Sequence, residues 1–130
     1  ALDAVRAWWE ETLSIAPMPV PDAARMPVYS SWYNFHKDIH ADMLLKECKI
    51  AKQLGMETII VDDGWQTGEN GVGYGYTGDW EPYTDKFPDM QSFVTQVHAL
   101  GMKVMVWYSV PFVGYFSKNF WPKVQEYWSI

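Results

Sequence analysis

The feature that most constrains the fold is a regular alternation of strand-like and helix-like segments. β-Branched and aromatic residues at 28–33, 57–62 and 103–109 predict three strands. Apolar residues at helical spacing within 41–54, and again after Asp89, predict one helix in each interval between strands. Strands that alternate with helices form parallel sheets with right-handed crossovers. The pattern therefore predicts an α/β fold.

The two predicted helices also carry start and stop signals. Asp89 is a predicted N-cap, and Gly55 and Gly101 are predicted helix stops. Cys48 shares an apolar stripe with Leu44 and Ala51, so we expect a small buried hydrophobic residue rather than a reactive thiol.

The two ends of the chain differ from this pattern. Residues 2–14 predict an amphipathic helix, and the four prolines within 15–27 predict an extended, structureless linker. A third helix is predicted at 118–129. The chain begins with Ala1 instead of Met and ends inside this predicted helix, so we expect a fragment of a longer protein.

Two architectures share the β-α alternation: a doubly wound sheet and a (β/α)₈ barrel. A full barrel needs about 250 residues, so of a barrel this chain could supply at most a partial TIM barrel, its first three β/α units preceded by an N-terminal helix. The expected divisions are a leading helix and Pro-rich linker at 1–26 and the β/α units at 27–130. The nearest match to a phosphate-binding loop, Gly71–Gly75, does not directly follow a predicted strand, so no dinucleotide cofactor is expected.

Composition excludes several partners. The net charge is −6 and no basic cluster is present, so a nucleic-acid partner is not expected. No run of about 18 apolar residues exists, so no membrane span is expected. A single cysteine excludes an internal disulfide, and the first residues do not show a signal-peptide pattern. We therefore expect a cytoplasmic protein.

The residues that follow the predicted strands have the chemistry of a sugar site. Ligands of α/β proteins bind at the carboxyl ends of the strands. The first predicted strand ends in Trp32 and Tyr33, and the second ends in Asp62, with Asp63 and Trp65 close behind it. The 25 residues from 64 to 88 form a long loop that adds further aromatic and acidic residues, namely Tyr74, Tyr76, Asp79, Trp80, Glu81 and Tyr83. Indole rings pack on the apolar faces of a pyranose, and carboxylates accept hydrogen bonds from its hydroxyls.

Structural interpretations of the same residues stay open. Asp63-Gly64 is also a turn signal, Trp32 and Trp65 could be core residues, and Asn34 could cap a turn. His36 and His40 are four residues apart, but no third ligand lies nearby, so a solvated helix start is favoured and no metal is expected.

Asp62 and Asp63 are not expected to be a catalytic pair. Glycosidase carboxylates flank the scissile bond, about 5–9.5 Å apart. Neighbours on a strand point to opposite faces instead. Positioning a sugar is therefore the better role for this pair.

Several of these segments, taken together, resemble the melibiase-type α-galactosidases over nearly all of residues 27–114. The resemblance lies in SWY (31–33), IIVDDGWQT (59–67), GDWEP (78–82), KFPDM (86–90) and VHALGMKVMVWYSVPFVG (97–114). It implies a (β/α)₈ barrel that hydrolyses terminal α-galactosides with retention.

The resemblance also implies roles for individual residues. Asp62 and Asp63 match the aspartates that hold the C4 and C6 hydroxyls of galactose, and Trp32 and Trp65 match aromatics of the sugar pocket. The loop that covers the pocket would include Trp80 and Asp79.

The family's bond-breaking residues are expected to be absent. In the family, the nucleophile lies in a Lys-x-Asp motif after strand four, and the acid/base Asp follows strand six. No Lys-x-Asp follows an apolar strand here. We therefore expect a fragment of a retaining α-galactosidase that positions sugar and is inactive alone. A stand-alone carbohydrate-binding or assembly module is the alternative. Unpaired edge strands predict self-association or association with the missing barrel half.

Overall fold

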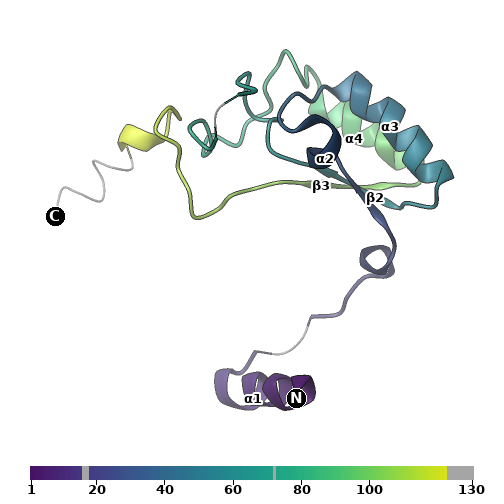
Figure 1. Cartoon of the computed structure of the whole chain (residues 1–130), viewed down its shortest axis with the longest axis vertical. Helices are drawn as coiled ribbons and strands as arrows, with labels where there is room; N and C mark the ends of the chain where they lie inside the picture. The colour runs from purple at the N-terminus through teal and green to yellow at the C-terminus, as the bar shows by residue number, and fades with distance from the viewer. Residues whose placement is uncertain (16–17, 72, 123–130) are drawn as a thin grey trace.

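The computed structural model describes residues 1–15, 18–71 and 73–122, and it confirms an α/β fold. Three strands, β1 (Val28–Ser30), β2 (Thr58–Val61) and β3 (Lys103–Val106), form one sheet in the order β1-β2-β3. Both pairings are parallel, with Ile60 opposite Ser30 on one side and Met105 on the other. The sheet is therefore built from consecutive strands joined by crossovers (Figure 1).

Two helices form the crossovers and pack side by side. Helix α3 (Ala41–Gln53) connects β1 to β2, and α4 (Met90–Ala99) connects β2 to β3. The stripe predicted from spacing is buried, because Leu44 and Cys48 of α3 are fully inaccessible to solvent. Figure 1 shows both helices over the same side of the sheet. The core between helices and sheet consists of Ile39, Leu44, Cys48, Ala51, Ile59, Val61, Trp65, Phe87, Phe93, Val97 and Met102.

The predicted capping signals are confirmed. The Asp89 side chain accepts a hydrogen bond from the backbone N–H of Ser92 at 2.8 Å, which satisfies a donor of the first turn of α4. Gly55 and Gly101 have φ angles of +85° and +72°, in the left-handed region where glycine ends helices without steric cost.

The first strand is shorter than its sequence predicted. β1 ends at Ser30, and Trp32–Phe35 forms the short helix α2. The backbone hydrogen bonds from this segment to β2 end with the one from Ser31 N–H to the Ile60 carbonyl, at 3.1 Å. Beyond Val61 the neighbouring chain turns away, so the β-prone residues after Ser31 have no strand to pair with. The prediction of a strand to residue 33 was therefore wrong, and for β3 the prediction to residue 109 was also too long.

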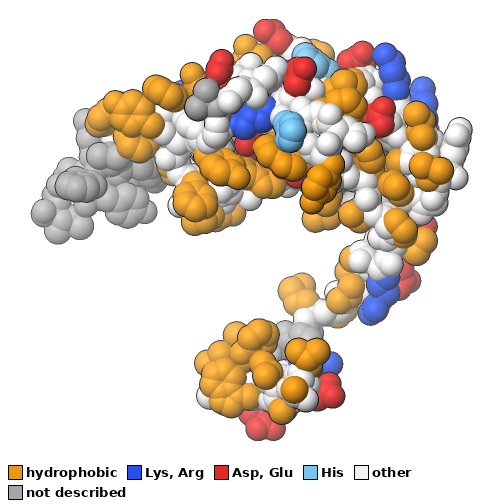
Figure 2. Space-filling model, in the orientation of Figure 1, with side chains coloured by type: hydrophobic (Ala, Val, Ile, Leu, Met, Phe, Trp, Pro, Cys, Tyr) orange, Lys and Arg blue, Asp and Glu red, His pale blue; other side chains and the backbone are white. Residues whose placement is uncertain are grey.

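The N-terminal segment lies apart from the sheet in Figure 1. Helix α1 (Leu2–Leu13) confirms the predicted helix, yet none of its residues is buried. Figure 2 shows hydrophobic side chains gathered on its surface, Trp8 and Trp9 among those that are exposed. The prediction of a structureless linker at 15–27 was wrong in one part. Residues Asp22–Arg25 form a 3₁₀ turn, η1, in which Ala24 N–H donates to Pro21 O at 2.9 Å.

Most of the helix predicted at 118–129 lies outside the described residues. Among the helices that the structure describes, none has the length and apolar character to cross a membrane.

Candidate functional site

The residues that directly follow the three strands meet at one edge of the sheet. The Ser31 hydroxyl, at the end of β1, accepts a hydrogen bond from Asp62 N–H at 3.0 Å. On the other side, Trp107 N–H donates to the Val61 carbonyl at 2.9 Å. Trp32, Asp62 and Trp107 therefore follow neighbouring strands at the same level. Trp107 was not among the predicted site residues, although its place near the end of the strand predicted at 103–109 was a usable signal.

The two adjacent aspartates have different environments. Asp62 is half-buried, and its Oδ1 accepts a hydrogen bond from Asp63 N–H at 2.8 Å. Asp63 is only 1% exposed. Its Oδ1 accepts from Gln66 Nε2 at 2.7 Å, and its Oδ2 lies 3.4 Å from Lys37 Nζ. Asp63-Gly64 therefore does form a turn, as the turn signal in the sequence indicated. The same contacts also bury the Asp63 carboxylate beside the Lys37 ammonium, and a turn alone does not require a buried ion pair.

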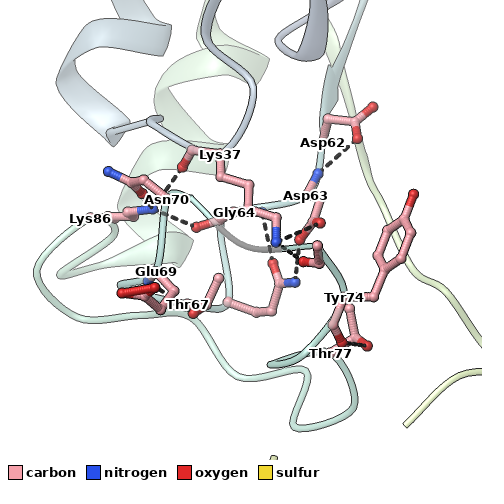
Figure 3. Close-up of polar contacts among 12 residues, drawn as sticks. Lys37, Asp62, Asp63, Gly64, Thr67, Glu69, Asn70, Tyr74, Thr77 and Lys86 are labelled. Carbon is pink, nitrogen blue, oxygen red and sulfur yellow. Dashed lines mark hydrogen bonds and ion pairs between the residues drawn. The ribbon is translucent and has the colours of Figure 1, made fainter. Parts of the chain in front are cut away.

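Two buried lysines, Lys37 and Lys86, hold this turn in place, and neither was predicted as a site residue. The Lys37 ammonium pairs with Asp63 and also donates to the Gly73 carbonyl (Figure 3). Lys86 Nζ donates to the carbonyl of Lys37 at 2.7 Å, to that of Gly64 at 3.2 Å and to Asn70 Oδ1 at 2.6 Å. Burial lowers the pKa of Lys86, and the nearby charges of Asp38 and Asp63 oppose that shift.

Glycine is required where the chain passes Lys37. Gly64 has a φ of +118°, and a Cβ at this position would lie 2.4 Å from the Lys37 carbonyl oxygen. The Asp63-Gly64 turn can therefore approach the segment after α2 only because residue 64 has no side chain.

Two of the predicted aromatics, Trp65 and Trp80, belong to an aromatic cluster near the aspartates. Trp65 is 2% exposed, and its Nε1 donates to the Trp107 carbonyl at 3.0 Å. Trp80 stacks on Trp65 with ring centroids 6.4 Å apart and meets the Trp107 ring edge-on at 5.8 Å. Tyr74 stacks on the Trp107 ring at 6.0 Å. Trp65 thus belongs to the core, and Trp80 and Tyr74 extend the aromatic surface from it.

Trp32 and Asp63 share a cavity of about 210 Å³. Its remaining lining residues are Lys37, Asn70, Gly71, Gly73 and Tyr74. Asp79 does not reach this cavity. Its Oδ2 accepts from Lys118 N–H at 3.1 Å and its Oδ1 from Asn119 N–H at 3.3 Å. The structure therefore brings together Trp32, Asp62 and Asp63 at the strand ends, stacks Trp65 with Trp80 beside them, and places Asp79 elsewhere.

His36 and His40, which are four residues apart, do not lie on the same helix. His36 ends α2 with a φ of +48°, and His40 precedes α3. The helical spacing considered for a metal pair therefore does not apply. Within 1–15, 18–71 and 73–122, no three His, Cys, Asp or Glu side chains gather as metal ligands.

Comparison with known proteins identifies a matching family. The family model described as Melibiase matches residues 15–121. The chain is 32% identical over 97 residues to the alpha-galactosidase Mel36A of Lactobacillus acidophilus, and 34% identical over 92 residues to alpha-galactosidase 1 of Pediococcus pentosaceus. These matches cover 74% and 70% of this chain but only 13% and 12% of the relatives. The chain thus spans about an eighth of their length.

The solved structures agree with these sequence matches. The alpha-galactosidase of Lactobacillus brevis superimposes with a TM-score of 0.71 at 28% identity, over 78% of this chain and 14% of that one. A Thermus thermophilus alpha-galactosidase in complex with p-nitrophenyl α-D-galactopyranoside gives a TM-score of 0.63 at 30% identity, over 79% of this chain and 19% of that one.

Proposed function

This chain belongs to the melibiase family, and from that membership we propose that it carries the sugar-positioning part of an α-galactosidase site. The observation that carries the proposal is the meeting of Trp32, Asp62 and Trp107 directly after three neighbouring strands. A half-buried carboxylate after the middle strand, with an indole after each neighbouring strand, offers an acceptor for sugar hydroxyls and flat faces for the pyranose ring.

The scaffold we propose is the first part of a (β/α)₈ barrel at 27–130, preceded by the leading segment at 1–26. The strand order β1-β2-β3 follows the chain, and α3 and α4 lie over the same side, as successive barrel units do (Figure 1). Along β3, Val104 and Val106 are half-buried whereas Met105 is 55% exposed. Parallel strands are normally covered on both faces, so the exposed face of β3 fits a barrel interior that further strands would complete.

Within this site we propose separate roles for the predicted residues. Asp62 and Asp63 bind the C4 and C6 hydroxyls of galactose, and Trp32 packs on the sugar. Asp63 lines the same cavity as Trp32, and its Oδ2 accepts from a hydroxyl once the Lys37 ammonium shifts aside. Trp65 and Trp80 stack on each other and support the sugar-binding residues without contacting the sugar themselves. Asp79 acts on the loop that carries Trp80 rather than on the sugar.

We further propose that these 130 residues position an α-galactoside without cleaving it. The sequence contains no Lys-x-Asp motif, in which the family's nucleophile lies. Cleavage then requires association with the rest of a barrel, which could pair with β1 and β3, the two edge strands of the sheet that the structure describes. The complete protein would be a retaining α-galactosidase.

The test compares binding of methyl α-galactoside and methyl α-glucoside to the 130-residue chain by saturation-transfer NMR. We expect saturation of the galactoside that Asp62→Asn abolishes. Asp42→Asn is the matched control, because Asp42 is an exposed aspartate on α3 that forms a surface ion pair with Lys46 at 3.7 Å. Hydrolysis of p-nitrophenyl α-galactoside by the chain alone, abolished by Asp62→Asn, would overturn the separation of positioning from cleavage. Equal saturation of both sugars would overturn the proposed specificity.

A further inference from the structure

One oxygen of the Asp63 carboxylate is a buried acceptor beside a cavity. Its Oδ1 accepts from Gln66 Nε2 at 2.7 Å, but none of the described residues donates a hydrogen bond to its Oδ2. Lys37 Nζ lies 3.4 Å from Oδ2, farther than the roughly 2.7–2.9 Å of a charged N–H···O hydrogen bond. Buried acceptors ordinarily have a hydrogen-bond donor, so this oxygen marks the place of a donor that a ligand brings.

Lys37 lines the same cavity of about 210 Å³ as Asp63, so a ligand there meets an ammonium as well as a carboxylate. We propose that Lys37 is a specificity-determining residue, which binds the C6 hydroxyl of galactose together with Asp63. The ammonium donates to the hydroxyl oxygen, and the hydroxyl donates to Asp63 Oδ2. This inference rests on the proposed function, because it assigns a further residue to the same galactose site.

The surrounding chain holds Lys37 in place before a ligand arrives. Its carbonyl accepts from Lys86 Nζ at 2.7 Å and from Ile39 N–H at 2.9 Å. Its ammonium donates to the Gly73 carbonyl on the other side of the cavity and faces Asp63 (Figure 3). An ammonium has several N–H donors, so Lys37 can keep the Gly73 contact while it makes room for a hydroxyl and donates to it. The binding group is therefore preorganised, which lowers the cost of binding.

The pair of opposite charges selects a hydroxyl over an ionised group. A hydroxyl both donates and accepts, so one oxygen serves Lys37 and Asp63 at the same time. A ligand ammonium can only donate and is repelled by Lys37, and a ligand carboxylate can only accept and is repelled by Asp63. The two side chains are only 7% and 2% exposed, so solvent ions screen these repulsions little.

The depth of the pair favours the hydroxyl on the exocyclic carbon of galactose. The cavity is smaller than the roughly 300–1,000 Å³ of sites that enclose a whole drug-sized ligand, so it holds part of a sugar. The C6 hydroxyl stands on a carbon outside the pyranose ring and reaches farther into a recess than the ring hydroxyls do. Asp62, which is half-buried at the strand ends, is left for the C4 hydroxyl.

The experiment compares two sugars that differ only at C6, methyl α-galactoside and methyl 6-amino-6-deoxy-α-galactoside, by saturation-transfer NMR titration at pH 7. We expect the wild-type chain to bind the amino sugar at least about tenfold more weakly than the galactoside, because its ammonium meets Lys37. Lys37→Met should reverse this preference, since the ligand ammonium then takes the place of the lysine beside Asp63. A lysine that only supported the fold would not change which of the two sugars is preferred.

Two further variants separate charge from position. Lys37→Arg keeps a cation beside Asp63 and should still reject the amino sugar. Lys46→Met is the matched control, because Lys46 is exposed on α3 and its removal should leave both affinities unchanged. Lys37→Met leaves the Asp63 carboxylate without its cation, so circular dichroism checks that the variant folds. If it does not fold, the wild-type chain and Lys37→Arg still decide, because Asp63 alone would attract the ammonium that they should reject.

The outcomes distinguish this proposal from the proposed function. Equal or tighter binding of the amino sugar by the wild-type chain overturns the role of Lys37, and so does an unchanged preference in a folded Lys37→Met variant. In both cases the galactoside still binds, and the galactose site itself stands. If the wild-type chain does not bind the galactoside at all, the proposed function fails and the role of Lys37 fails with it.

Discussion

The side-chain amide of Gln66 joins the carboxylate of Asp63 to the backbone of Gly64. Its Nε2 donates to Asp63 Oδ1 at 2.7 Å, and its Oε1 accepts from Gly64 N–H at 3.1 Å. An amide is the side chain that can do both, because it has a donor and an acceptor on one planar group.

Replacing this amide with a carboxylate should destabilise the fold. In Gln66→Glu the acceptor for Gly64 N–H remains, but an oxygen faces Asp63 where a donor stood. Two buried carboxylates at that distance should lower the free energy of unfolding by about 2–4 kcal/mol at neutral pH. Urea denaturation measures the change. Gln91→Glu, an exposed isosteric control on α4, should change stability little, and equal midpoints for both variants would contradict the assigned role.

Gly64 provides a second test of the same turn. Gly64→Ala puts a Cβ 2.4 Å from the Lys37 carbonyl at a φ of +118°, so it combines a steric clash with backbone strain. We expect a loss of about 2–5 kcal/mol. Gly55→Ala separates the two effects, because its φ is +85° but nothing lies within 4 Å of the added Cβ. It should lose only about 1–2 kcal/mol. Thermal unfolding of both variants measures whether the steric contact with Lys37 or the positive φ angle accounts for most of the lost stability.

The parts of the fold that depend on local periodicity were predictable from the sequence. The spacing of Leu44, Cys48 and Ala51 predicted α3 and its buried stripe, and Asp89 predicted the start of α4. The end of β1 was not predictable, because it is set by where the neighbouring chain turns away after Val61 and not by the preferences of Trp32 and Tyr33 themselves.

The candidate site divides in the same way. The position of Asp62 after a buried strand could be read from the sequence, because strand ends align in a parallel sheet. The burial of Lys37 and Lys86 could not. Lysine is ordinarily exposed, and the carbonyl acceptors of Lys86 come from residues 49 and 22 positions away along the chain. Such contacts follow only from the tertiary arrangement of the long loop.

Lys86 should make stability depend on alkaline pH. Burial lowers its pKa below the usual 10.5. Between that lowered value and 10.5 the unfolded chain binds more protons than the folded chain, so the contribution of Lys86 to stability rises with pH in this window. Lys86→Met should remove this rise. It should also lower stability by about 2–4 kcal/mol near pH 7, because three acceptors lose their donor.

The test measures the urea midpoints of the wild-type chain and of Lys86→Met between pH 7 and 10.5. The difference between wild type and Lys86→Met should grow with pH. Lys46→Met is the control, because Lys46 is exposed and its ion pair with Asp42 lies on the surface. A difference that shrinks as pH rises would show that the charged ammonium, rather than the neutral amine, is favoured in the fold.

Cys48 should be unreactive in the folded chain. It is fully buried in the core, and that burial, with a smaller contribution from the Glu47 charge, raises its pKa to about 11. Disulfide reagents attack the thiolate, which is scarce at pH 8 for such a group. The reaction of the native chain with Ellman's reagent should therefore follow unfolding, and its rate should rise with urea in parallel with the loss of helix signal. A Gln53→Cys variant in a Cys48→Ala background places a thiol at an exposed position on the same helix, and it should react at once without urea. Native Cys48 reacting as fast as this control would mean that the contact between α3 and the sheet opens without global unfolding.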